Sequence, residues 1–333
     1  MSDRLTNISI IGDGGWGTTL AVHLARKGYR VRLWGAFPDY VRQVRKTRIN
    51  SKFLPGVKIP PKVELVTDLK SAIQGCGLVV LAVPSQYLQG VLECLKHLDL
   101  RGKAFLSVIK GIDCASLMRM SQIIEKSLGR VPLAVLSGPT IAMEVAREIP
   151  TTAVIAARDA KFAQALQTIF HSRHFRIYTN DDVVGVELGG SVKNIIAIAS
   201  GVCDGLGFGT NTKAAILTRG LAEMTRLGKA LGARKETFFG LTGLGDLVTT
   251  CMSPRSRNRS VGEALGKGRS IKQITSSMQM VAEGVETAKA VHRLDQKLRI
   301  DMPITREVYR IIYKNKKPRK AVEDLMRRQR KAE

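Results

Sequence analysis

The chain has 333 residues, enough for two or three domains, and its hydrophobic fraction of 44% and charged fraction of 24% are those of an average globular protein. These values exclude a fibrous chain and a wholly disordered one. The charge is unusual, because 53 Lys and Arg residues against 28 Asp and Glu residues give a net charge of +25. Such an excess attracts nucleic acid, membrane surfaces and small phosphorylated ligands alike, so charge by itself does not choose among them.

The cysteines and the apolar runs bear on the cellular compartment. The five cysteines stand singly, without a CxxC pair, which predicts neither a disulfide framework nor a zinc knuckle. The polar N-terminus runs directly into a strand-like segment and leaves no room for a secretory signal. The apolar runs are shorter than the roughly 18 to 20 residues that a membrane helix needs. We therefore expect a cytoplasmic protein without an integral membrane segment.

The first half of the chain alternates short β-branched apolar runs with longer helical stretches. The runs lack the alternation of a half-exposed strand, so we expect an open parallel sheet whose strands are buried between helices on both sides. The expected strands are 8–11, 31–34, 78–83, 104–109, 133–136 and 153–157.

From residue 181 onward the pattern becomes almost entirely helical. A long apolar segment rich in small residues covers 183–203, and Gly-rich connections at 205–209 and 240–245 allow the backbone to approach a ligand closely. We therefore predict two domains, residues 1–190 and residues 191–333. Further helices are expected at 212–232, 260–267, 270–277, 283–298, 304–313 and 318–330.

The last segment, 314–331, is strongly basic. It holds nine basic residues and only Glu323 and Asp324 as acids. No aromatic residues are interleaved with these charges, whereas proteins that bind single-stranded nucleic acid stack bases on aromatic side chains. We interpret the segment as a solvated helical tail, and we expect no nucleic-acid partner.

The first strand-to-helix junction carries GDGGWG at residues 12–17, which fits the pattern GxGxxG. A predicted strand precedes it and a predicted helix, 16–27, follows, which is the context that a dinucleotide-binding turn requires. Gly12 allows a tight turn, Gly14 lets the backbone approach a pyrophosphate, and Gly17 lets the helix pack on the strand. The N–H groups at the helix start then face the phosphates. A turn that serves packing alone is the less favoured interpretation.

The end of the second predicted strand bears on the choice of cofactor. An NAD-preferring site usually carries Asp or Glu there, and the segment 32–37, RLWGAF, has neither. Without that carboxylate the usual repulsion against a 2′-phosphate is missing. The sequence therefore predicts NAD or NADP, with Arg32, Arg42 or Arg45 as partners of a 2′-phosphate. The five histidines show no metal-ligand spacing, so no metal is expected.

Many strings along the chain, read in order, are similar to those of one family. They are GDGGWGTTLA at 12–21, FLPG at 53–56, VPS at 83–85, KGI at 110–112, SGPTIAMEV at 137–145, GGSVKNIIAI at 189–198, RGLAEMTRLG at 219–228, GLTGLGDLVTTC at 240–251, SRNR at 256–259, VAEGVETA at 281–288 and MPIT at 302–305. The chain resembles the NAD(P)-dependent glycerol-3-phosphate dehydrogenase family of bacterial and plastid type, from residue 8 to about residue 326.

This resemblance implies both a fold and a reaction. The implied fold class is an α/β Rossmann-type N-terminal domain with an all-α C-terminal domain, the two-domain architecture of 6-phosphogluconate dehydrogenase. The implied reaction is the reversible reduction of dihydroxyacetone phosphate by NAD(P)H to sn-glycerol 3-phosphate, which supplies the backbone of phospholipids. The implied partners are a small phosphorylated substrate and a second copy of the chain in a homodimer.

The resemblance also implies catalytic residues. Lys193 matches the general acid/base, and an ammonium near a ketone oxygen supplies both a proton and charge stabilisation as hydride arrives. Lys110 matches a residue that contacts substrate and cofactor, and a second cation lowers the pKa of a neighbouring lysine. Asp246 matches the acid that touches the substrate hydroxyls. The alternatives are a solvated charge for either lysine and a helix cap for Asp246.

The remaining contacts are likewise carried over from the resemblance. Ser256, Arg257 and Asn258 match a phosphate-binding triplet whose donors suit a dianion, with a solvated basic loop as the alternative. Cofactor contacts are implied for Gly12, Gly14, Gly15, Trp16, Gly17, Lys110, Ala142, Arg257, Val281 and Glu283. Substrate contacts are implied for Lys110, Gly138, Thr140, Lys193, Asp246, Ser256, Arg257 and Asn258.

Two departures from the family pattern limit the transfer. Ala36 stands where the family commonly has Arg or His, so the usual clamp on a 2′-phosphate is missing, and Gly15 replaces a frequent Ser. Two other functions stay open on the residues alone. One is a different two-domain NAD(P) dehydrogenase of the same superfamily, and the other is an anion-binding relative without catalysis.

Overall fold

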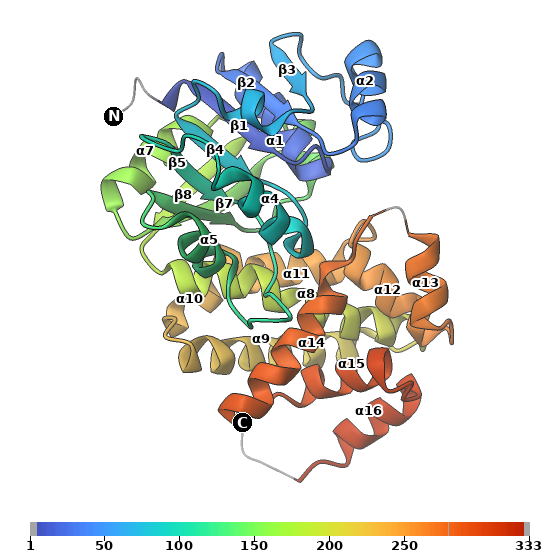
Figure 1. The fold of residues 1–333 in the computed structure, drawn as a ribbon. Helices are drawn as coiled ribbons and strands as arrows, with labels where there is room; N and C mark the ends of the chain where they lie inside the picture. Colours follow the sequence, from blue (N-terminus) through green and yellow to red (C-terminus); the bar gives the residue numbers. More distant parts are fainter. Residues whose placement is uncertain (1–4, 279, 330–333) are drawn as a thin grey trace. The chain divides into compact units, whose positions relative to one another are not determined.

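The structure, a computed structural model, describes residues 5–278 and 280–329. The chain folds as two compact units (Figure 1). The α/β unit contains the described residues up to Lys110 together with Arg119–Glu187, and the helical unit contains Gly111–Met118 and the described residues from Leu188 onward. The predicted domain division, after residue 190, lies inside the helix that runs through the break between these units.

The α/β unit is built on one 8-stranded sheet among the described residues, in the order β3-β2-β1-β4-β5-β6-β7-β8. The strands are β1 (Asn7–Ile11), β2 (Arg30–Trp34), β3 (Val63–Val66), β4 (Leu78–Leu81), β5 (Ala104–Ser107), β6 (Leu133–Ser137), β7 (Thr151–Ala157) and β8 (Phe175–Asn180). Every residue of β4 and β5 is buried, as expected for central strands covered on both faces.

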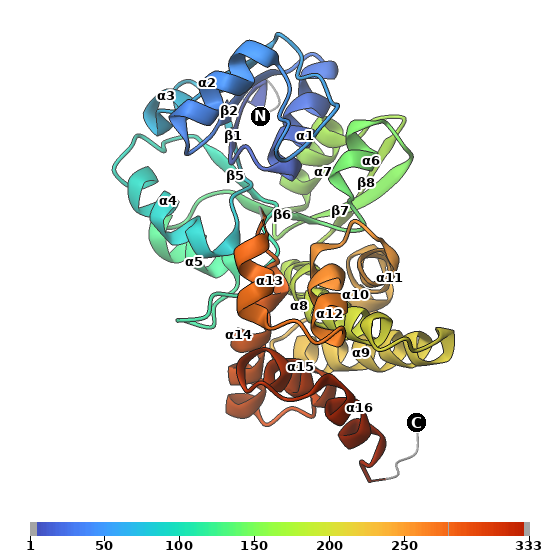
Figure 2. The same cartoon turned by 90° about the vertical axis from the view of Figure 1, so that its right-hand side faces the viewer.

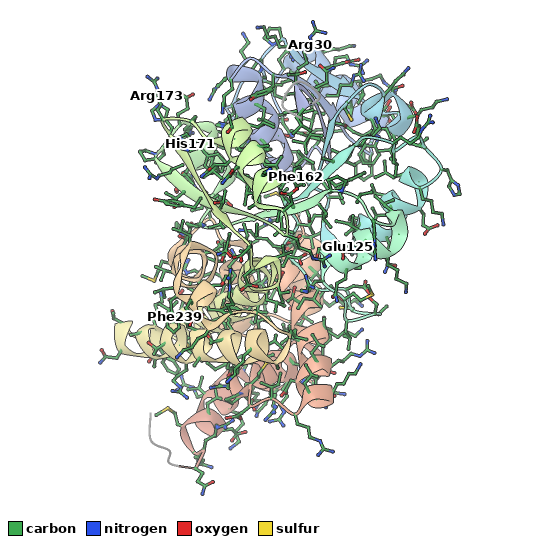
Figure 3. The ribbon with its side chains drawn as sticks, turned by 90° about the vertical axis from the view of Figure 1, so that its left-hand side faces the viewer. Arg30, Glu125, Phe162, His171, Arg173 and Phe239 are labelled. Atoms are coloured by element: carbon green, nitrogen blue, oxygen red, sulfur yellow. The ribbon has the colours of Figure 1, made fainter. Side chains whose placement is uncertain are left out.

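Helices cover both faces of this sheet. They are α1 (Gly15–Arg26), α2 (Pro38–Thr47), α3 (Leu69–Ile73), α4 (Leu88–Leu95), α5 (Met120–Leu128), α6 (Ala142–Ala146) and α7 (Ala160–Phe170). Figure 2 shows α4 and α5 on one side of the strands and α1, α6 and α7 on the other. Phe162 of α7 is buried, whereas Arg30 and Arg173 project from the surface (Figure 3).

The sheet differs from the prediction in two respects. Strands β3 and β8 were not expected, because β3 carries the exposed Glu64 among its four residues and β8 alternates buried and exposed side chains, as an edge strand does. In addition, β7 runs antiparallel to β6, so the sheet, which was predicted as parallel, contains an antiparallel pair. The link between them contains only the five-residue α6. A helix of that length spans about 7.5 Å, against about 17 Å for a five-residue strand, so it does not return the chain across the sheet.

Among the described residues the helical unit contains helices and no strand (Figure 1). After α8 (Val183–Gly205), which starts in the α/β unit, follow α9 (Thr210–Ala230), α10 (Lys235–Phe239), η3 (Leu241–Gly245), α11 (Asp246–Met252), α12 (Arg257–Gly266), α13 (Ile271–Ser277), α14 (Glu283–Leu298), α15 (Pro303–Tyr313) and α16 (Pro318–Met326). The predicted helices from 212 onward are confirmed, although α16 ends at Met326 and residue 330 lies outside the described residues.

Two predicted Gly-rich connections have different outcomes. The connection 205–209 is confirmed, since α8 ends at Gly205 and α9 begins at Thr210. The segment 240–245 is instead a π-helical turn that continues directly into α11. This turn packs closely on α8, because a Cβ on Gly189 would lie 2.4 Å from the carbonyl oxygen of Thr242. The small residues of α8 therefore serve close helix packing.

Helix α8 also bears on the membrane question. It is the one helix among the described residues that is long and apolar enough to cross a membrane by length and composition, and 89% of its apolar stretch is buried inside the structure. A core helix has this character, so α8 gives no argument for a membrane span.

The basic tail is partly neutralised. Lys316 lies 2.5 Å from a carboxylate oxygen of Glu307 and 2.7 Å from one of Asp324, and Arg328 lies 2.9 Å from Asp301. Ion pairs thus hold α16 onto the helical unit. One face of this part of the tail is packed, and the other is solvated.

Candidate functional site

The glycines of the turn between β1 and α1 have three different environments. Gly12 has a φ of +121°, and a Cβ there would lie 2.7 Å from the carbonyl oxygen of Ala82 at the end of β4. A Cβ on Gly17 would lie 1.9 Å from the carbonyl oxygen of Gly12. Around Gly14, by contrast, a Cβ would meet no atom within 4 Å. The turn therefore needs two glycines for its own packing and leaves a third open toward a ligand, as a pyrophosphate site requires.

A loop residue that the sequence analysis did not single out holds this turn. The Asn50 side chain is buried, and its Nδ2 donates to the Asp13 carbonyl at 2.7 Å and to Thr18 Oγ1 at 2.8 Å. The Tyr40 hydroxyl donates to Asn50 Oδ1 at 2.7 Å. Since a lone Asn in a loop belongs to no motif, only the fold identifies it as the anchor of the glycine turn.

Three further predicted cofactor contacts lie around the start of α1. A Cβ on Gly15 would be 2.7 Å from the carbonyl oxygen of Phe53, which explains why this chain carries no Ser there. The Thr19 hydroxyl donates to the Ala142 carbonyl at 3.1 Å and so brings α6 to the turn. The Trp16 ring packs edge-on against Phe175, with centroids 6.2 Å apart. Trp16 thus serves as a packing residue at the helix start.

Lys110, Gly138 and Thr140 meet at the carboxyl ends of the neighbouring parallel strands β5 and β6. Lys110 Nζ donates to the Gly138 carbonyl at 3.0 Å, and the Thr140 hydroxyl donates to the same oxygen at 3.1 Å. Gly138 has a φ of +141°, which turns its carbonyl away from the regular strand path. The structure therefore brings all three predicted residues of this unit's substrate group onto one carbonyl.

The three arginines predicted as partners of a 2′-phosphate are engaged elsewhere. Arg32 Nε donates to Glu64 at 2.9 Å, and its guanidinium also donates to the Ser71 carbonyl. Arg45 donates to a backbone carbonyl of β3 at 2.6 Å. Arg42 forms an exposed ion pair with its neighbour on α2, Asp39, a type of contact that contributes little stability. In this conformation the end of β2 has no cationic clamp made by these arginines.

Lys193 and Asp246 form a buried ion pair in the helical unit. Lys193 Nζ lies 2.7 Å from Asp246 Oδ1, and the two side chains are 6% and 2% exposed. The ammonium also donates to the hydroxyl of Thr250, one turn further along α11. Burial raises the pKa of the adjacent Cys251 to about 12, so that thiol stays protonated. The pair is therefore the charged centre of a largely apolar surrounding, where an unpaired ammonium would be costly.

The local fold explains this pairing. Asp246 is the first residue of α11, but the N-cap position belongs to Gly245. The alternative that Asp246 caps the helix is therefore wrong, and its carboxylate is directed at α8 instead. The close packing of the π-helical turn on Gly189 brings the start of α11 to the face of α8 that carries Lys193.

The predicted phosphate triplet starts α12. Ser256 is the N-cap, and its Oγ accepts from the Arg259 backbone N–H at 3.2 Å. The Arg257 guanidinium donates to the Val281 carbonyl at 2.7 Å. Asn258 is buried, with its Nδ2 donating to Asn194 Oδ1 at 2.9 Å and its Oδ1 accepting from a backbone N–H near the start of α14. The triplet is thus an ordered helix start, and the alternative of a solvated loop is wrong.

The predicted residues therefore fall into one group in each unit. The α/β unit holds the glycine turn, Ala142 and the cluster on the Gly138 carbonyl. The helical unit holds Lys193 with Asp246 and, one residue further along α8, Asn194 with the triplet; Glu283 begins α14 beside them. Thr250 and Asn194 were not predicted as site residues, although both lie inside strings that carry the family resemblance.

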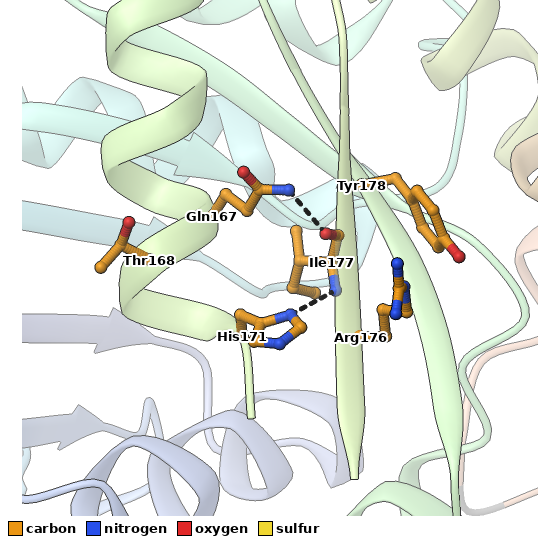
Figure 4. A pocket seen from close by; sticks show the side chains of 6 residues that line it. All are labelled: Gln167, Thr168, His171, Arg176, Ile177 and Tyr178. Carbon is orange, nitrogen blue, oxygen red and sulfur yellow. Dashed lines mark hydrogen bonds between the residues drawn. The ribbon is translucent and has the colours of Figure 1, made fainter. Parts of the chain in front are cut away.

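A hollow of about 520 Å³ lies elsewhere, along the edge strand β8 (Figure 4). Gln167 Nε2 donates to the Ile177 carbonyl at 2.8 Å, and the Ile177 N–H donates to His171 Nδ1 at 3.3 Å. These bonds tie α7 to β8, and no predicted site residue lines the hollow. In the described part of the chain, no group of three or more His, Cys, Asp or Glu side chains is placed to hold a metal ion.

The fold and the glycine turn define the class of protein. An open α/β sheet with GxGxxG at its first strand-to-helix junction, followed by a helical unit with a buried Lys–Asp pair, is the organisation of a two-domain dinucleotide-dependent dehydrogenase. Family models narrow this class. Residues 7–163 match the N-terminal model, and residues 182–323 the C-terminal model, of NAD-dependent glycerol-3-phosphate dehydrogenase. The chain belongs to the NAD-dependent glycerol-3-phosphate dehydrogenase family.

Individual relatives agree with this assignment. The chain is 50% identical to glycerol-3-phosphate dehydrogenase (NAD(P)+) of Prosthecochloris aestuarii over 98% of this chain and 99% of the relative. It is similar in structure to glycerol-3-phosphate dehydrogenase of Coxiella burnetii, with a TM-score of 0.94 and 41% identity, covering 97% of this chain and 99% of the other. A D-mandelate dehydrogenase, 13% identical over 95% of this chain and 99% of the other with a TM-score of 0.63, shares the fold alone.

Proposed function

We propose that this protein reduces dihydroxyacetone phosphate reversibly to sn-glycerol 3-phosphate with NADH or NADPH. In the reduction, carbon 2 of the ketone gains a hydride, which NADH or NADPH would supply, and the ketone oxygen gains a proton. The observation that carries the proposal is the buried Lys193–Asp246 pair in a chain whose two halves both match this family. The family match also favours this reaction over that of another two-domain dehydrogenase.

Lys193 supplies the proton. Its ammonium is a donor already directed by Asp246 Oδ1 and by Thr250, so its position is set before a substrate arrives. An oriented ammonium stabilises the negative charge that develops on the ketone oxygen and then gives up a proton to it. Asp246 balances the charge of Lys193 in the buried surroundings and accepts hydrogen bonds from substrate hydroxyls.

The start of α12 holds the substrate phosphate. A helix N-terminus presents backbone N–H groups and a partial positive charge, and Arg257 adds a guanidinium next to them. Asn258 uses one of its amide N–H groups for Asn194 and so fixes this helix start relative to α8. In the α/β unit, Lys110 with Gly138 and Thr140 provides a cation and polar groups of the kind that a phosphorylated substrate binds.

The glycine turn holds the cofactor, which supplies the hydride when bound. The space in front of Gly14 and the first N–H groups of α1 fit a pyrophosphate, because no neighbouring atom fills that position. The residues present therefore fit NAD or NADP, and the relatives that carry NAD(P)+ in their names agree with this cofactor.

Three further properties belong to the proposal. We infer that the protein works in the cytoplasm, where all five cysteines stay reduced, in keeping with their free state here. We infer that the protein is a homodimer and that it binds no nucleic acid. We also infer that its product, glycerol phosphate, is used for phospholipid synthesis. Light scattering during gel filtration tests the dimer, and a monomer at micromolar concentration contradicts it.

A spectrophotometric assay tests the reaction. The protein is mixed with dihydroxyacetone phosphate and either reduced cofactor, and the loss of absorbance at the nicotinamide band is followed. We expect oxidation that requires the phosphorylated ketone and that falls by about 10²-fold or more in Lys193→Ala, the scale of a lost proton-transfer group. Activity that survives this substitution removes Lys193 from the mechanism. No oxidation of either cofactor by the wild-type protein contradicts the enzyme function, and the anion-binding relative then remains.

A further inference from the structure

The segment that follows β2 lacks the acidic residue that usually recognises an adenosine ribose, yet a carboxylate from another segment lies at that place. The segment after β2 begins Gly35-Ala36-Phe37 and carries no acid. However, a Cβ built on Gly35 would lie 2.4 Å from Asp13 Oδ2. The Asp13 side chain, which comes from the glycine turn, therefore occupies the space in front of the carboxyl end of β2. That is the position where the acid of a dinucleotide fingerprint acts.

The backbone that carries Asp13 is held firmly. Its carbonyl accepts from Asn50 Nδ2 at 2.7 Å and from the Thr18 hydroxyl at 3.1 Å. The turn on either side is packed through Gly12 and Gly17, where no Cβ is tolerated. The direction in which the Asp13 carboxylate leaves the turn is therefore set by the fold.

The carboxylate is partly desolvated and carries a negative charge at neutral pH. Burial raises the pKa of Asp13 to about 6, while its own backbone N–H and the charge of Lys52 favour the ionised form. A partly buried anion interacts with a nearby charge more strongly than a fully solvated one does. The arginines Arg32, Arg42 and Arg45, which would offset its effect on a phosphate, are bound to other groups.

We propose that Asp13 is the residue that selects the cofactor, by accepting a hydrogen bond from the adenosine ribose 2′-hydroxyl and repelling a 2′-phosphate. Asp13, which belongs to the glycine turn, thus replaces the acidic residue that is absent at the end of β2. The protein consequently prefers NADH to NADPH. This inference rests on the proposed function for its physiological meaning, but cofactor binding tests it without turnover.

The test compares Asp13→Asn with Asp99→Asn. The first substitution keeps the side-chain shape and removes its charge, whereas the second removes one charge from an exposed residue near the start of β5. Calorimetry measures the binding of ADP and of 2′,5′-ADP, and steady-state kinetics measure kcat/KM for NADH and NADPH. We expect the wild-type protein to favour ADP and NADH. In Asp13→Asn we expect the preference for ADP over 2′,5′-ADP, and for NADH over NADPH, to fall about tenfold or more, because the repulsion between the carboxylate and the 2′-phosphate is lost. Asp99→Asn leaves the ratio unchanged.

The outcomes separate the two proposals. If Asp13→Asn weakens both ligands by the same factor, Asp13 has only a structural role and the inference is wrong. A wild-type preference for NADPH or 2′,5′-ADP also overturns it. If the ligand preference follows Asp13 but no cofactor is oxidised with dihydroxyacetone phosphate, the proposed reaction fails and the inference stands.

Discussion

The glycine turn of the α/β unit and the Lys193–Asp246 pair of the helical unit are built on opposite principles. The turn functions through backbone and through missing side chains, since a Cβ on Gly12 or Gly17 would strike backbone atoms. The pair functions through two charged side chains held in an apolar surrounding. One region is sensitive to added volume, and the other is sensitive to an unbalanced charge.

This difference decides how each region tolerates change. A ligand bound by backbone N–H groups places few demands on side-chain type, so at Gly15 the demand comes from packing, since a Cβ there would lie 2.7 Å from the Phe53 carbonyl oxygen. A buried ion pair places strict demands on both partners, because removing one leaves the other desolvated and uncompensated. Three experiments break or sharpen the comparison.

The largest effect on stability is expected at the ion pair. Lys193→Met and Asp246→Asn each remove one charge of the buried pair, so each single variant loses about 3 to 5 kcal/mol of unfolding free energy. The double variant loses less than the sum, because neither charge then remains. Urea titration followed by circular dichroism measures all four proteins. Strictly additive losses would show that the two residues are not energetically coupled.

The glycine turn is tested by two matched substitutions. Gly17→Ala places a Cβ 1.9 Å from the Gly12 carbonyl oxygen. Overpacking of this kind costs about 1 to 3 kcal/mol, so we expect the variant to lose at least that much unfolding free energy. Gly14→Ala meets no atom within 4 Å, and the φ of Gly14 is −63°, so its stability stays within about 0.5 kcal/mol of wild type.

Cofactor binding provides the second measurement on this pair of variants. The added methyl group of Gly14→Ala fills the space assigned to the pyrophosphate, so we expect its affinity for ADP to fall about tenfold, equivalent to about 1.4 kcal/mol. Calorimetry on the folded Gly14→Ala protein measures this. Unchanged affinity there would place the pyrophosphate elsewhere.

The last expected effect concerns pH and belongs to the α/β unit. Burial lowers the pKa of His23 to about 4, and His23 Nε2 lies 2.7 Å from the Phe170 carbonyl oxygen. The folded-state pKa lies below the ordinary value of 6.5, so the folded protein favours the neutral imidazole. The contribution of His23 to folding stability is therefore fully present above pH 6.5 and is lost as the pH falls toward 4. The loss amounts to about 2 to 3 kcal/mol.

A substitution isolates this contribution. His23→Gln retains an N–H donor without titrating, so its midpoint of unfolding should vary less between pH 7 and pH 4 than that of the wild-type protein. His97→Gln, at an exposed position of the same unit, serves as the control. If both variants follow the wild-type pH profile, His23 is not the buried titrating group.

The sheet shows where sequence patterns suffice and where they do not. Central strands such as β4 and β5 were predicted because burial on both faces leaves a continuous apolar run. The edge strand β8 was missed because half of its side chains face outward. The direction of β7 was also missed, since strand direction depends on the path of the connecting chain and leaves no mark in the strand's own residues.

The amino-acid sequence by itself determined the family, the two-part organisation and the glycine turn, because glycines with such spacing at a strand-to-helix junction answer a local steric requirement. Only the tertiary structure decided which partners meet. Lys193 and Asp246 are far apart in the chain and are joined by close packing of helices, and Asn50 and Asp13 acquire their positions from a loop folded onto the turn. Such contacts depend on the path of the whole backbone, which no local pattern of residues records.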